Sequence, residues 1–260
     1  MVRLHVDTDI GGDIDDVCAL ALVLGWQGAE LVGVTTVAEH AGRRAGYARY
    51  LLGLAGREDV PVAAGADASG GFYSEFPLLP KREDEYWPGG VESYPTPAVE
   101  ALGLLERSIR AGAVVCAIGP LTNLALLERR TPGILREARL CLMGGFVFPP
   151  RAGFPVWDYK SDYNVQADAP SARVVFEHAT RPTLVTLAVT AETALRASHL
   201  PALRGGAPSR ASSRRRPRST RSRRTGRPST RAATRGCPRT SSTTSTTRSP
   251  APSRSVGKTG

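Results

Sequence analysis

Residues 2–16 read Val-Arg-Leu-His-Val-Asp-Thr-Asp-Ile-Gly-Gly-Asp-Ile-Asp-Asp, an apolar stretch followed at once by five aspartates. The apolar residues 2–6 predict a β-strand, and the aspartates begin where that strand ends. Five carboxylates within ten residues repel one another unless a cation or protons lie among them. One Asp would suffice to cap a helix or form a turn. The segment is therefore a candidate ligand site.

Short apolar runs alternate with helix-like segments through the first 200 residues. Strands are predicted at residues 2–6, 31–37, 60–64, 113–118, 140–143 and 183–189. Helices are predicted at residues 14–26, 41–55, 98–110, 123–129 and 169–178. This alternation predicts an α/β fold with a mostly parallel open sheet and helices on both faces. Ligands bind such sheets beyond the carboxyl ends of the strands, where loops 7–16, 118–123 and the segment after residue 143 should meet.

The charge of the chain changes sharply near residue 200. The 260 residues carry a net charge of +10, yet all 24 acidic residues lie at or before Glu192. Residues 201–260 hold 15 Arg and one Lys, whereas residues 1–200 hold 18 basic residues. We predict an α/β domain at 1–200 and a disordered Arg/Ser/Thr/Pro-rich tail at 201–260, because the tail has too few apolar side chains to offset its ordering entropy. The tail alone predicts salt-sensitive, non-specific binding to nucleic acid.

The cysteines and the N-terminus indicate a cytoplasmic protein. Cys18, Cys116, Cys141 and Cys237 show no CxxC spacing, and we expect buried, reduced thiols. The N-terminus lacks the pattern of a signal peptide, and no apolar run approaches the roughly 18 residues that a membrane span needs. We therefore expect no membrane partner.

The acidic loop resembles the N-terminal signature of the inosine-uridine-preferring nucleoside hydrolases, a D-x-D-x-G followed by paired aspartates that binds calcium and ribose. This chain has two additional residues before the pair. The resemblance implies that Asp9 ligates Ca²⁺ and accepts a proton from its bound water, that Asp16 is a second ligand, and that Asp15 binds ribose hydroxyls. Asp7 would support these ligands, and Asp13 could replace one of them. Oxygen ligands suit Ca²⁺, and a metal-held water beside a carboxylate is a competent nucleophile.

Two later blocks extend the resemblance over roughly residues 2–195. Residues 117–123, Ala-Ile-Gly-Pro-Leu-Thr-Asn, are similar to the family's GPLTN segment, which implies a calcium-binding backbone carbonyl at Ile118 and a supporting role for Asn123. A Gly-Pro turn with a helix cap is the alternative, and one segment can do both.

The third block joins residues 142–145, Leu-Met-Gly-Gly, to residues 162–168, Asp-Tyr-Asn-Val-Gln-Ala-Asp. It resembles the family's MGG strand end and its E-[FW]-N-x-x-x-D segment. The resemblance implies that Asn164 and Asp162 contact the sugar and that Asp168 caps the next helix. Asp162 is shorter than the family's usual Glu. The ordered set of blocks is more specific than any single one.

One family motif is absent from the sequence. The C-terminal His-Asp-Pro, whose His protonates the departing base and whose Asp ligates calcium, does not occur. Residues 244–250 read Thr-Ser-Thr-Thr-Arg-Ser-Pro, and their codons read one nucleotide earlier can encode Leu-His-Asp-Pro-Leu-Ala. Our hypothesis is a frameshift in the codons for residues 197–210, which leaves residues 201–260 out of frame and the 260-residue product impaired.

The resemblance thus implies a homo-oligomeric ribonucleoside hydrolase of purine or pyrimidine salvage, which cleaves the N-glycosidic bond to free base and ribose with a calcium-activated water. One alternative is a phosphatase of the haloacid dehalogenase type, with Asp7 and Asp9 as nucleophile and acid. The tandem Asp15-Asp16 and the GPLTN segment argue against it. The other alternative is a binder of anionic polymers that acts through the basic tail. The tail has no aromatic residue, which argues against specific recognition of single-stranded nucleic acid.

Overall fold

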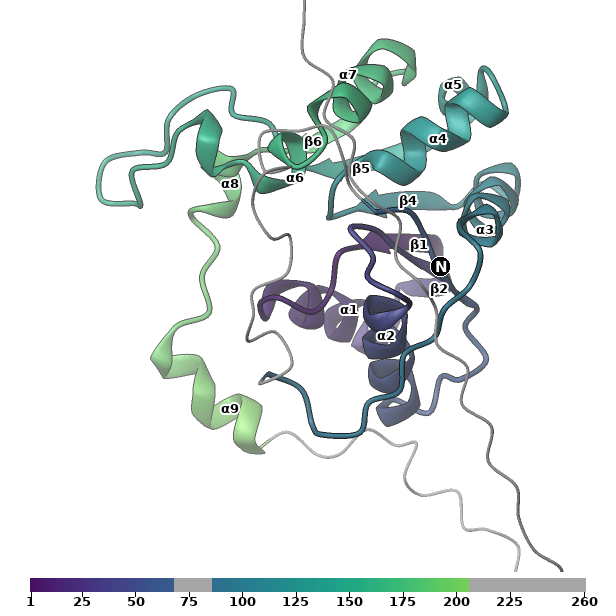
Figure 1. Ribbon diagram of the computed structural model, residues 1–260. Helices are drawn as coiled ribbons and strands as arrows, with labels where there is room; N and C mark the ends of the chain where they lie inside the picture. Colours follow the sequence, from purple (N-terminus) through teal and green to yellow (C-terminus); the bar gives the residue numbers. More distant parts are fainter. Residues whose placement is uncertain (68–85, 206–260) are drawn as a thin grey trace, which may run out of the picture. The chain divides into compact units, whose positions relative to one another are not determined.

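The computed structural model describes residues 1–67 and 86–205. This part contains one sheet whose strands follow the order β3-β2-β1-β4-β5-β6 (Figure 1). The strands are β1 (Val2–Thr8), β2 (Ala29–Thr36), β3 (Val62–Ala64), β4 (Val114–Ala117), β5 (Arg139–Met143) and β6 (Thr183–Val185). Every neighbouring pair is parallel, so the predicted parallel α/β sheet is confirmed.

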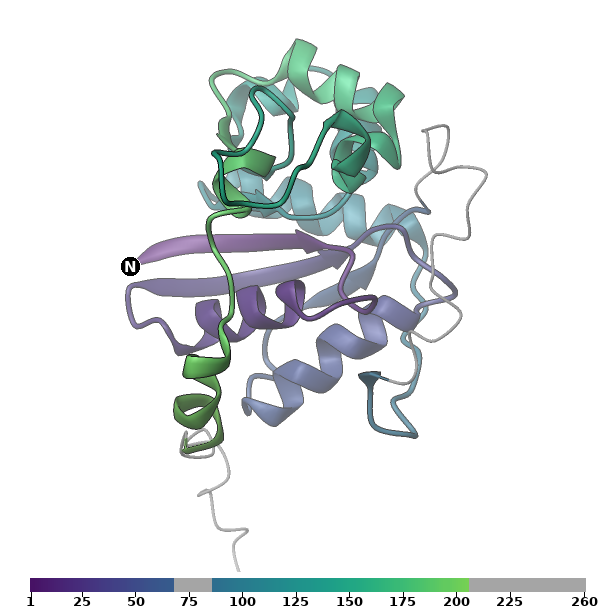
Figure 2. The same ribbon diagram turned by 90° about the vertical axis from the view of Figure 1, so that its left-hand side faces the viewer.

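The helices cover both faces of this sheet, as predicted (Figures 1 and 2). Helices α1 (Asp15–Gly25) and α2 (Arg43–Leu54) pack over β2 and β3 on one face. The other face is covered by α3 (Ala98–Arg110), α4 (Thr122–Arg130), α5 (Ile134–Glu137) and α7 (Ala169–His178). Short elements complete the described chain: η3 (Tyr159–Ser161), α6 (Tyr163–Gln166), α8 (Leu187–Thr190), η4 (Ala197–His199) and α9 (Leu200–Gly205).

The strand order places a topological switch point between β1 and β4. From β1 the chain builds outward through β2 and β3, and then returns to the other side of β1 for β4, β5 and β6. Helices therefore leave the carboxyl ends of β1 and β4 toward opposite faces, which opens a crevice between those ends. Asp9 follows β1 and Ile118 follows β4, so both residues lie at this crevice.

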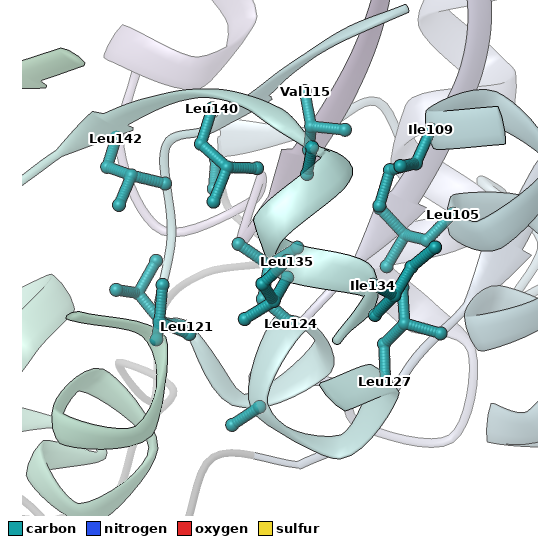
Figure 3. Close-up of a cluster of buried hydrophobic side chains, with 14 of the residues drawn as sticks. Leu105, Ile109, Val115, Leu121, Leu124, Leu127, Ile134, Leu135, Leu140 and Leu142 are labelled. Carbon is teal, nitrogen blue, oxygen red and sulfur yellow. The ribbon is translucent and has the colours of Figure 1, made fainter. Parts of the chain in front are cut away.

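The larger hydrophobic core lies between the sheet and the second helix layer (Figure 3). Alternate strand residues such as Val115 and Leu142 point into it, and they meet Leu105, Leu124 and Leu127 from the helices. These side chains are at most 1% exposed. Each such burial contributes about 2 kcal/mol relative to exposure, so this layer holds β4 and β5 in register.

Two expectations about the described residues are wrong. The predicted strand 183–189 ends at Val185, and residues 187–190 form α8 instead. β6 is an edge strand paired only with β5, so nothing extends its ladder after three residues. Cys18 is exposed on α1, and Cys116 and Cys141 are only half-buried, although all three thiols are free. Cys237 and most of the predicted tail lie outside the described residues.

Within residues 1–67 and 86–205, none of the helices has the length and apolar character needed to cross a lipid bilayer.

A chain of buried polar side chains crosses the centre of the sheet beneath the crevice. His5 on β1 is fully buried, with Nδ1 2.9 Å from Ser108 Oγ and Nε2 3.0 Å from Thr35 Oγ1. The Thr35 hydroxyl donates onward to Asp7 Oδ1, so the His5 Nε2–H donates to Thr35 and the Ser108 hydroxyl donates to Nδ1. Burial lowers the pKa of His5 to about 3, because the imidazolium would lose its hydration there.

Candidate active site

A cavity of 670 Å³ opens at the carboxyl ends of β1, β4 and β5. The acidic loop after β1, the end of β4 and the segment after β5 all contribute to its wall. The structure thus brings together six of the residues predicted for the site: Asp9, Asp13, Asp15, Asp16, Ile118 and Asn164. The predicted convergence of three loops at this edge of the sheet is therefore observed.

Three carboxylates of the acidic loop crowd together. One oxygen from each of Asp13, Asp15 and Asp16 lies within 4.8 Å of the others. Asp16 is buried and accepts a hydrogen bond from the Thr8 hydroxyl. A shared hydrogen bond with Asp15, and then burial, raises the pKa of Asp13 to about 7, while burial and then the charge of Asp9 raise the pKa of Asp16 well above its usual range. Neighbouring negative charges therefore oppose full ionisation of this cluster.

Asp7 lies behind the cavity wall and is completely buried. Its Oδ1 accepts from Asn123 Nδ2 at 2.9 Å and from the Thr35 hydroxyl, whereas its Oδ2 has no hydrogen-bond partner among the described residues. Burial raises the pKa of Asp7 to about 7, although both hydrogen bonds act in the opposite direction. A buried carboxylate with one unsatisfied oxygen is costly unless a proton or a cation compensates it.

Asn123, at the start of α4, ties two parts of this edge together. Besides Asp7 it contacts the Thr36 carbonyl through Nδ2 at 2.8 Å, and its Oδ1 accepts from the Ala66 backbone at 2.9 Å. The side chain is fully buried and is not part of the cavity wall. Asn123 therefore positions the strand ends around the site.

Arg44 is a residue of this site that sequence reasoning missed. It lies on α2, is 2% exposed, and lines the cavity. Its Nε donates to the Ala38 carbonyl at 2.8 Å, and its Nη1 donates to the carbonyls of Asp9 and Ile10. An Arg-Arg pair at a helix start is typical of a solvated surface, so the sequence contains no signal for this clamp. Arg44 fixes the backbone that presents the Asp9 carboxylate.

The start of α2 is held by a buried acid. Glu39 accepts hydrogen bonds from the backbone N–H groups of Arg44 and Ala45, at 2.9 and 3.1 Å, and from the Thr36 hydroxyl. A carboxylate at a helix N-terminus satisfies N–H groups that have no partner within the helix and interacts favourably with the helix dipole. This contact fixes the position of α2, and therefore of the Arg44 guanidinium.

Close backbone approach explains the glycine of the GPLTN segment. A Cβ on Gly119 would lie 2.7 Å from Asp9 Oδ1 and 2.9 Å from both Asp9 N and Val37 Cγ1. Only glycine lets the loop after β4 pack this closely against the loop after β1. On the other side of the acidic loop, Trp87 Nε1 donates to the Gly11 carbonyl at 3.1 Å while its ring stacks on Tyr47 at 4.2 Å between centroids.

The remaining predicted residues come from the segment after β5. Asn164 Nδ2 donates to the Ile118 carbonyl at 2.8 Å and to the Met143 carbonyl at 3.1 Å, so it joins the ends of β4 and β5. Asp162 is buried and its carboxylate caps α6 and accepts from the Gly145 N–H at 2.6 Å. Asp168 caps α7 and accepts from the Thr122 hydroxyl at 2.7 Å. Neither Asp162 nor Asp168 lines the cavity.

The aromatic part of the wall was also missed from the sequence. Trp157 and Tyr163 line the cavity together with Met143 and Leu187. Tyr163 lies inside the block that contains Asp162 and Asn164, so its position could have been inferred from that block. Trp157 lies outside every recognised motif, and only its aromatic character could have suggested a role.

The donor set of this site fits a hard divalent cation. It offers carboxylate oxygens from four aspartates and the Ile118 carbonyl on one cavity wall, and hard cations such as Ca²⁺ prefer such ligands. A cation bound there would offset the like charges that help to raise the pKa values of Asp13 and Asp16. The Ile118 carbonyl has two lone pairs, so its hydrogen bond from Asn164 leaves one for a ligand.

The fold and the site together define an α/β protein with an acidic cavity at the switch point of a parallel sheet. The sequence matches the family model of the inosine-uridine preferring nucleoside hydrolases over residues 4–236, and the chain belongs to that family. This membership argues against the phosphatase alternative, as does the burial of Asp7, its required nucleophile.

Individual relatives show how much of a family member the chain represents. It is 29% identical over 200 residues to the pyrimidine-specific ribonucleoside hydrolase RihA of Shewanella woodyi, which covers 71% of this chain and 60% of that protein. It is 29% identical over 191 residues to a probable uridine nucleosidase 2 of Arabidopsis thaliana, covering 67% and 55% of the two chains. The chain therefore spans less than two thirds of these relatives.

Solved structures share the fold. The purine-preferring ribonucleoside hydrolase from Gardnerella vaginalis superposes with a TM-score of 0.61 at 21% identity, over 78% of this chain and 66% of that one. The inosine-uridine preferring nucleoside hydrolase from Bacillus anthracis superposes with a TM-score of 0.54 at 20% identity, over 79% and 71%.

Proposed function

We propose that this chain is the scaffold of a ribonucleoside hydrolase that cleaves the N-glycosidic bond to free base and ribose. The observation that carries the proposal is the cluster of aspartates on the wall of the switch-point cavity. Family membership and the curated relatives support it, since those proteins are named as ribonucleoside hydrolases and nucleosidases.

The proposed roles are those that the family resemblance implies, and the position of each side chain supports them. Asp9 accepts the proton of the attacking water, and the Arg44 clamp on its backbone keeps its carboxylate in place. Asp15 is exposed whereas Asp16 is buried, so Asp15 holds the ribose hydroxyls, together with Asn164. The negative wall also favours the oxocarbenium-like transition state of glycoside cleavage, because positive charge develops on the sugar ring.

Asp9, Asp16 and the Ile118 carbonyl would hold a Ca²⁺ ion, with Asp13 able to take one of these places. When bound, the ion supplies a water of lowered pKa and neutralises the crowded carboxylates. Trp157 and Tyr163 line the same cavity, and their aromatic rings could stack with a base there.

Calcium binding can be tested without any substrate. Calorimetric titration of the full chain with CaCl₂ should show one site, and Asp16→Asn should weaken it by about tenfold or more, since the site loses a charged ligand. Glu30→Gln is the matched control, because Glu30 is an exposed acid on β2 away from the cavity. Equal affinities for the wild type and Asp16→Asn would remove Asp16 from the ligand set.

The described lining of the cavity lacks the histidine that the family resemblance implies for protonating a departing base. None of its lining residues in the described part of the chain is a histidine, and a poor leaving group such as hypoxanthine needs general acid catalysis. We propose that the 260-residue chain is impaired toward natural nucleosides and retains more activity toward p-nitrophenyl riboside, whose leaving group needs no proton.

Steady-state assays with inosine, uridine and p-nitrophenyl riboside in the presence of Ca²⁺ test this proposal. We expect measurable release of p-nitrophenol and little or no release of free base. Robust hydrolysis of inosine would refute the impairment. Failure to cleave any of the three substrates, with Ca²⁺ binding intact, would refute hydrolase activity for this chain.

We further propose that the impairment originates in the coding sequence. A frameshift near codons 197–210 would explain why the acidic residues stop at Glu192 and why the codons of residues 244–250 can encode His-Asp-Pro in another frame. Sequencing the gene is the test. The proposal fails if no single-nucleotide shift in that window restores His-Asp-Pro. If one does, the frame-corrected chain should gain activity toward inosine relative to p-nitrophenyl riboside.

A further inference from the structure

Cys116 and Cys141 lie directly opposite each other on neighbouring strands. β4 and β5 are parallel, and their register pairs the Cα atoms of these two residues. Side chains at paired positions of adjacent strands point to the same face of a sheet, and neighbouring strands lie about 4.8 Å apart. Cα atoms joined by a disulfide are usually about 4.4–6.8 Å apart. The backbone separation of this pair is thus already within the range of a disulfide.

The two thiols lie on the more open face of this part of the sheet. Their strand neighbours Val115 and Leu140 point the other way into the large core and are buried, whereas both cysteines are half-buried. Cys116 is in register with Val6, on the face where α1 and α2 pack over β2 and β3. Among the described residues, both thiols keep part of their surface exposed on this face, where a small reagent can reach them.

The immediate surroundings also favour reaction between these two groups. The neighbouring Cys116 side chain lowers the pKa of Cys141, whereas burial acts in the opposite direction. The strands themselves are held by hydrogen bonds and by the core, so the sulfurs stay adjacent. A neighbouring thiol held in place reacts far faster than one in solution.

We propose that Cys116 and Cys141 form a dithiol site that exchanges with small disulfides and closes to a reversible cross-strand disulfide. The Cys141 sulfur attacks a small disulfide RSSR, forms a mixed disulfide and releases one RS⁻. The Cys116 sulfur then gives up its proton and attacks the Cys141 sulfur, which releases the second thiol. In sum, the dithiol and RSSR become the protein disulfide and two RSH, with two electrons passing to the small disulfide.

The bond should be readily reduced. Cβ atoms of a disulfide lie about 3.5–4.5 Å apart, which is closer than the spacing of neighbouring strands, so bond formation draws β4 and β5 together locally. Strained or accessible disulfides have more oxidising potentials than structural ones. β4 leads into Ile118 and β5 ends at Met143, and both of these residues line the cavity. The proposal itself does not depend on the proposed hydrolase activity.

The test uses the full chain with Cys18→Ser and Cys237→Ser, so that only the pair remains. After incubation with oxidised glutathione, we expect loss of two titratable thiols, a mass decrease of two hydrogen atoms, and full reversal by dithiothreitol. The matched control, with Cys116→Ser in addition, should accumulate a stable mixed disulfide on Cys141. A mixed disulfide accumulating equally in both proteins, or disulfide-linked dimers, would overturn the proposal.

A second measurement covers the case in which a substituted chain fails to fold. The unaltered chain is treated with oxidised glutathione, its remaining thiols are blocked with N-ethylmaleimide, and it is digested without reduction for mass spectrometry. A peptide that links residues 116 and 141 supports the proposal. Links that involve Cys18 or Cys237 instead, or cysteines 116 and 141 both recovered as maleimide adducts, refute it.

Discussion

The contribution of His5 to stability should decrease on acidification from pH 7 to pH 5, and the size of this decrease follows from the burial of the imidazole. The pKa of His5 is lowered from 6.5 to about 3 by burial. The folded state therefore binds fewer protons than the unfolded state between these values, and stability that is complete above pH 6.5 is lost as the pH falls toward 3. Each pH unit in this window costs about 1.4 kcal/mol, so the change from pH 7 to pH 5 costs about 2 kcal/mol.

A variant that cannot be protonated isolates this contribution. His5→Gln keeps a polar donor near Thr35 but has no titrating group, although it costs stability at every pH because Ser108 loses its partner. Asp7 contributes in the opposite direction, since its pKa is raised to about 7, so the stability that it provides is present at low pH and is lost as the pH rises. That contribution is common to both proteins and cancels in their difference.

Urea titrations of both proteins at pH 7, 6 and 5 and at constant ionic strength provide the measurement. The free energy of unfolding of the wild type should fall by about 2 kcal/mol more than that of His5→Gln between pH 7 and pH 5. Parallel pH dependences of the two proteins would refute the reasoning, because they would show that the imidazole is not held neutral in the folded state.

Three further perturbations test the packing around the site by urea unfolding. Arg44→Met should lower the free energy of unfolding by about 3 kcal/mol, because buried carbonyls lose their donor; a loss below about 1 kcal/mol would contradict the clamp. Gly65→Ala should cost about 3 kcal/mol, since its Cβ would overlap a backbone carbonyl and a buried amide, whereas Gly53→Ala in α2 has free space and should gain about 0.5–1 kcal/mol. Leu127→Ala should cost about 3 kcal/mol, and the 60% exposed Leu54→Ala less than about 1 kcal/mol; similar losses would place Leu127 outside the core.

The elements that could be predicted from sequence are those with a strong hydrophobic pattern. Residues 98–110 and 169–178 are helical as predicted, because apolar residues recur at helical spacing and a Pro lies at or beside each helix start. Four-residue helices such as Ile134–Glu137 were missed, since one turn contains too few residues to show a period. The strand predicted over residues 183–189 was too long. Its β-branched residues favour a strand, but β6 has no outer neighbouring strand to extend it.

In the candidate site, too, residues in a local sequence motif could be predicted, whereas residues that depend on contacts between distant segments could not. Local carboxylates after a strand are visible as a motif, so Asp9, Asp15 and Asp16 could be placed at the edge of the sheet in advance. The positions of Arg44 and Trp87 could not be predicted, because each donates to a backbone carbonyl of the acidic loop from a distant segment of the chain. Every residue has a backbone carbonyl, so the sequence does not show which one accepts such a bond. Asp162 was identified as a residue of interest, but its bonding to the Gly145 backbone depends on how the chain turns after β5.

The position of β1 has a consequence for how the chain folds. β1 precedes the other described strands in the chain and lies inside the sheet, and its partner β4 starts only at Val114, more than a hundred residues later. Until then, one edge of β1 has no hydrogen-bonding partner, and the acidic loop lacks the Gly119 backbone against which it packs. Such non-local pairing slows folding and exposes strand edges to other chains. Until β4 has been made, the open edge of β1 is thus a place where another chain could pair and begin aggregation.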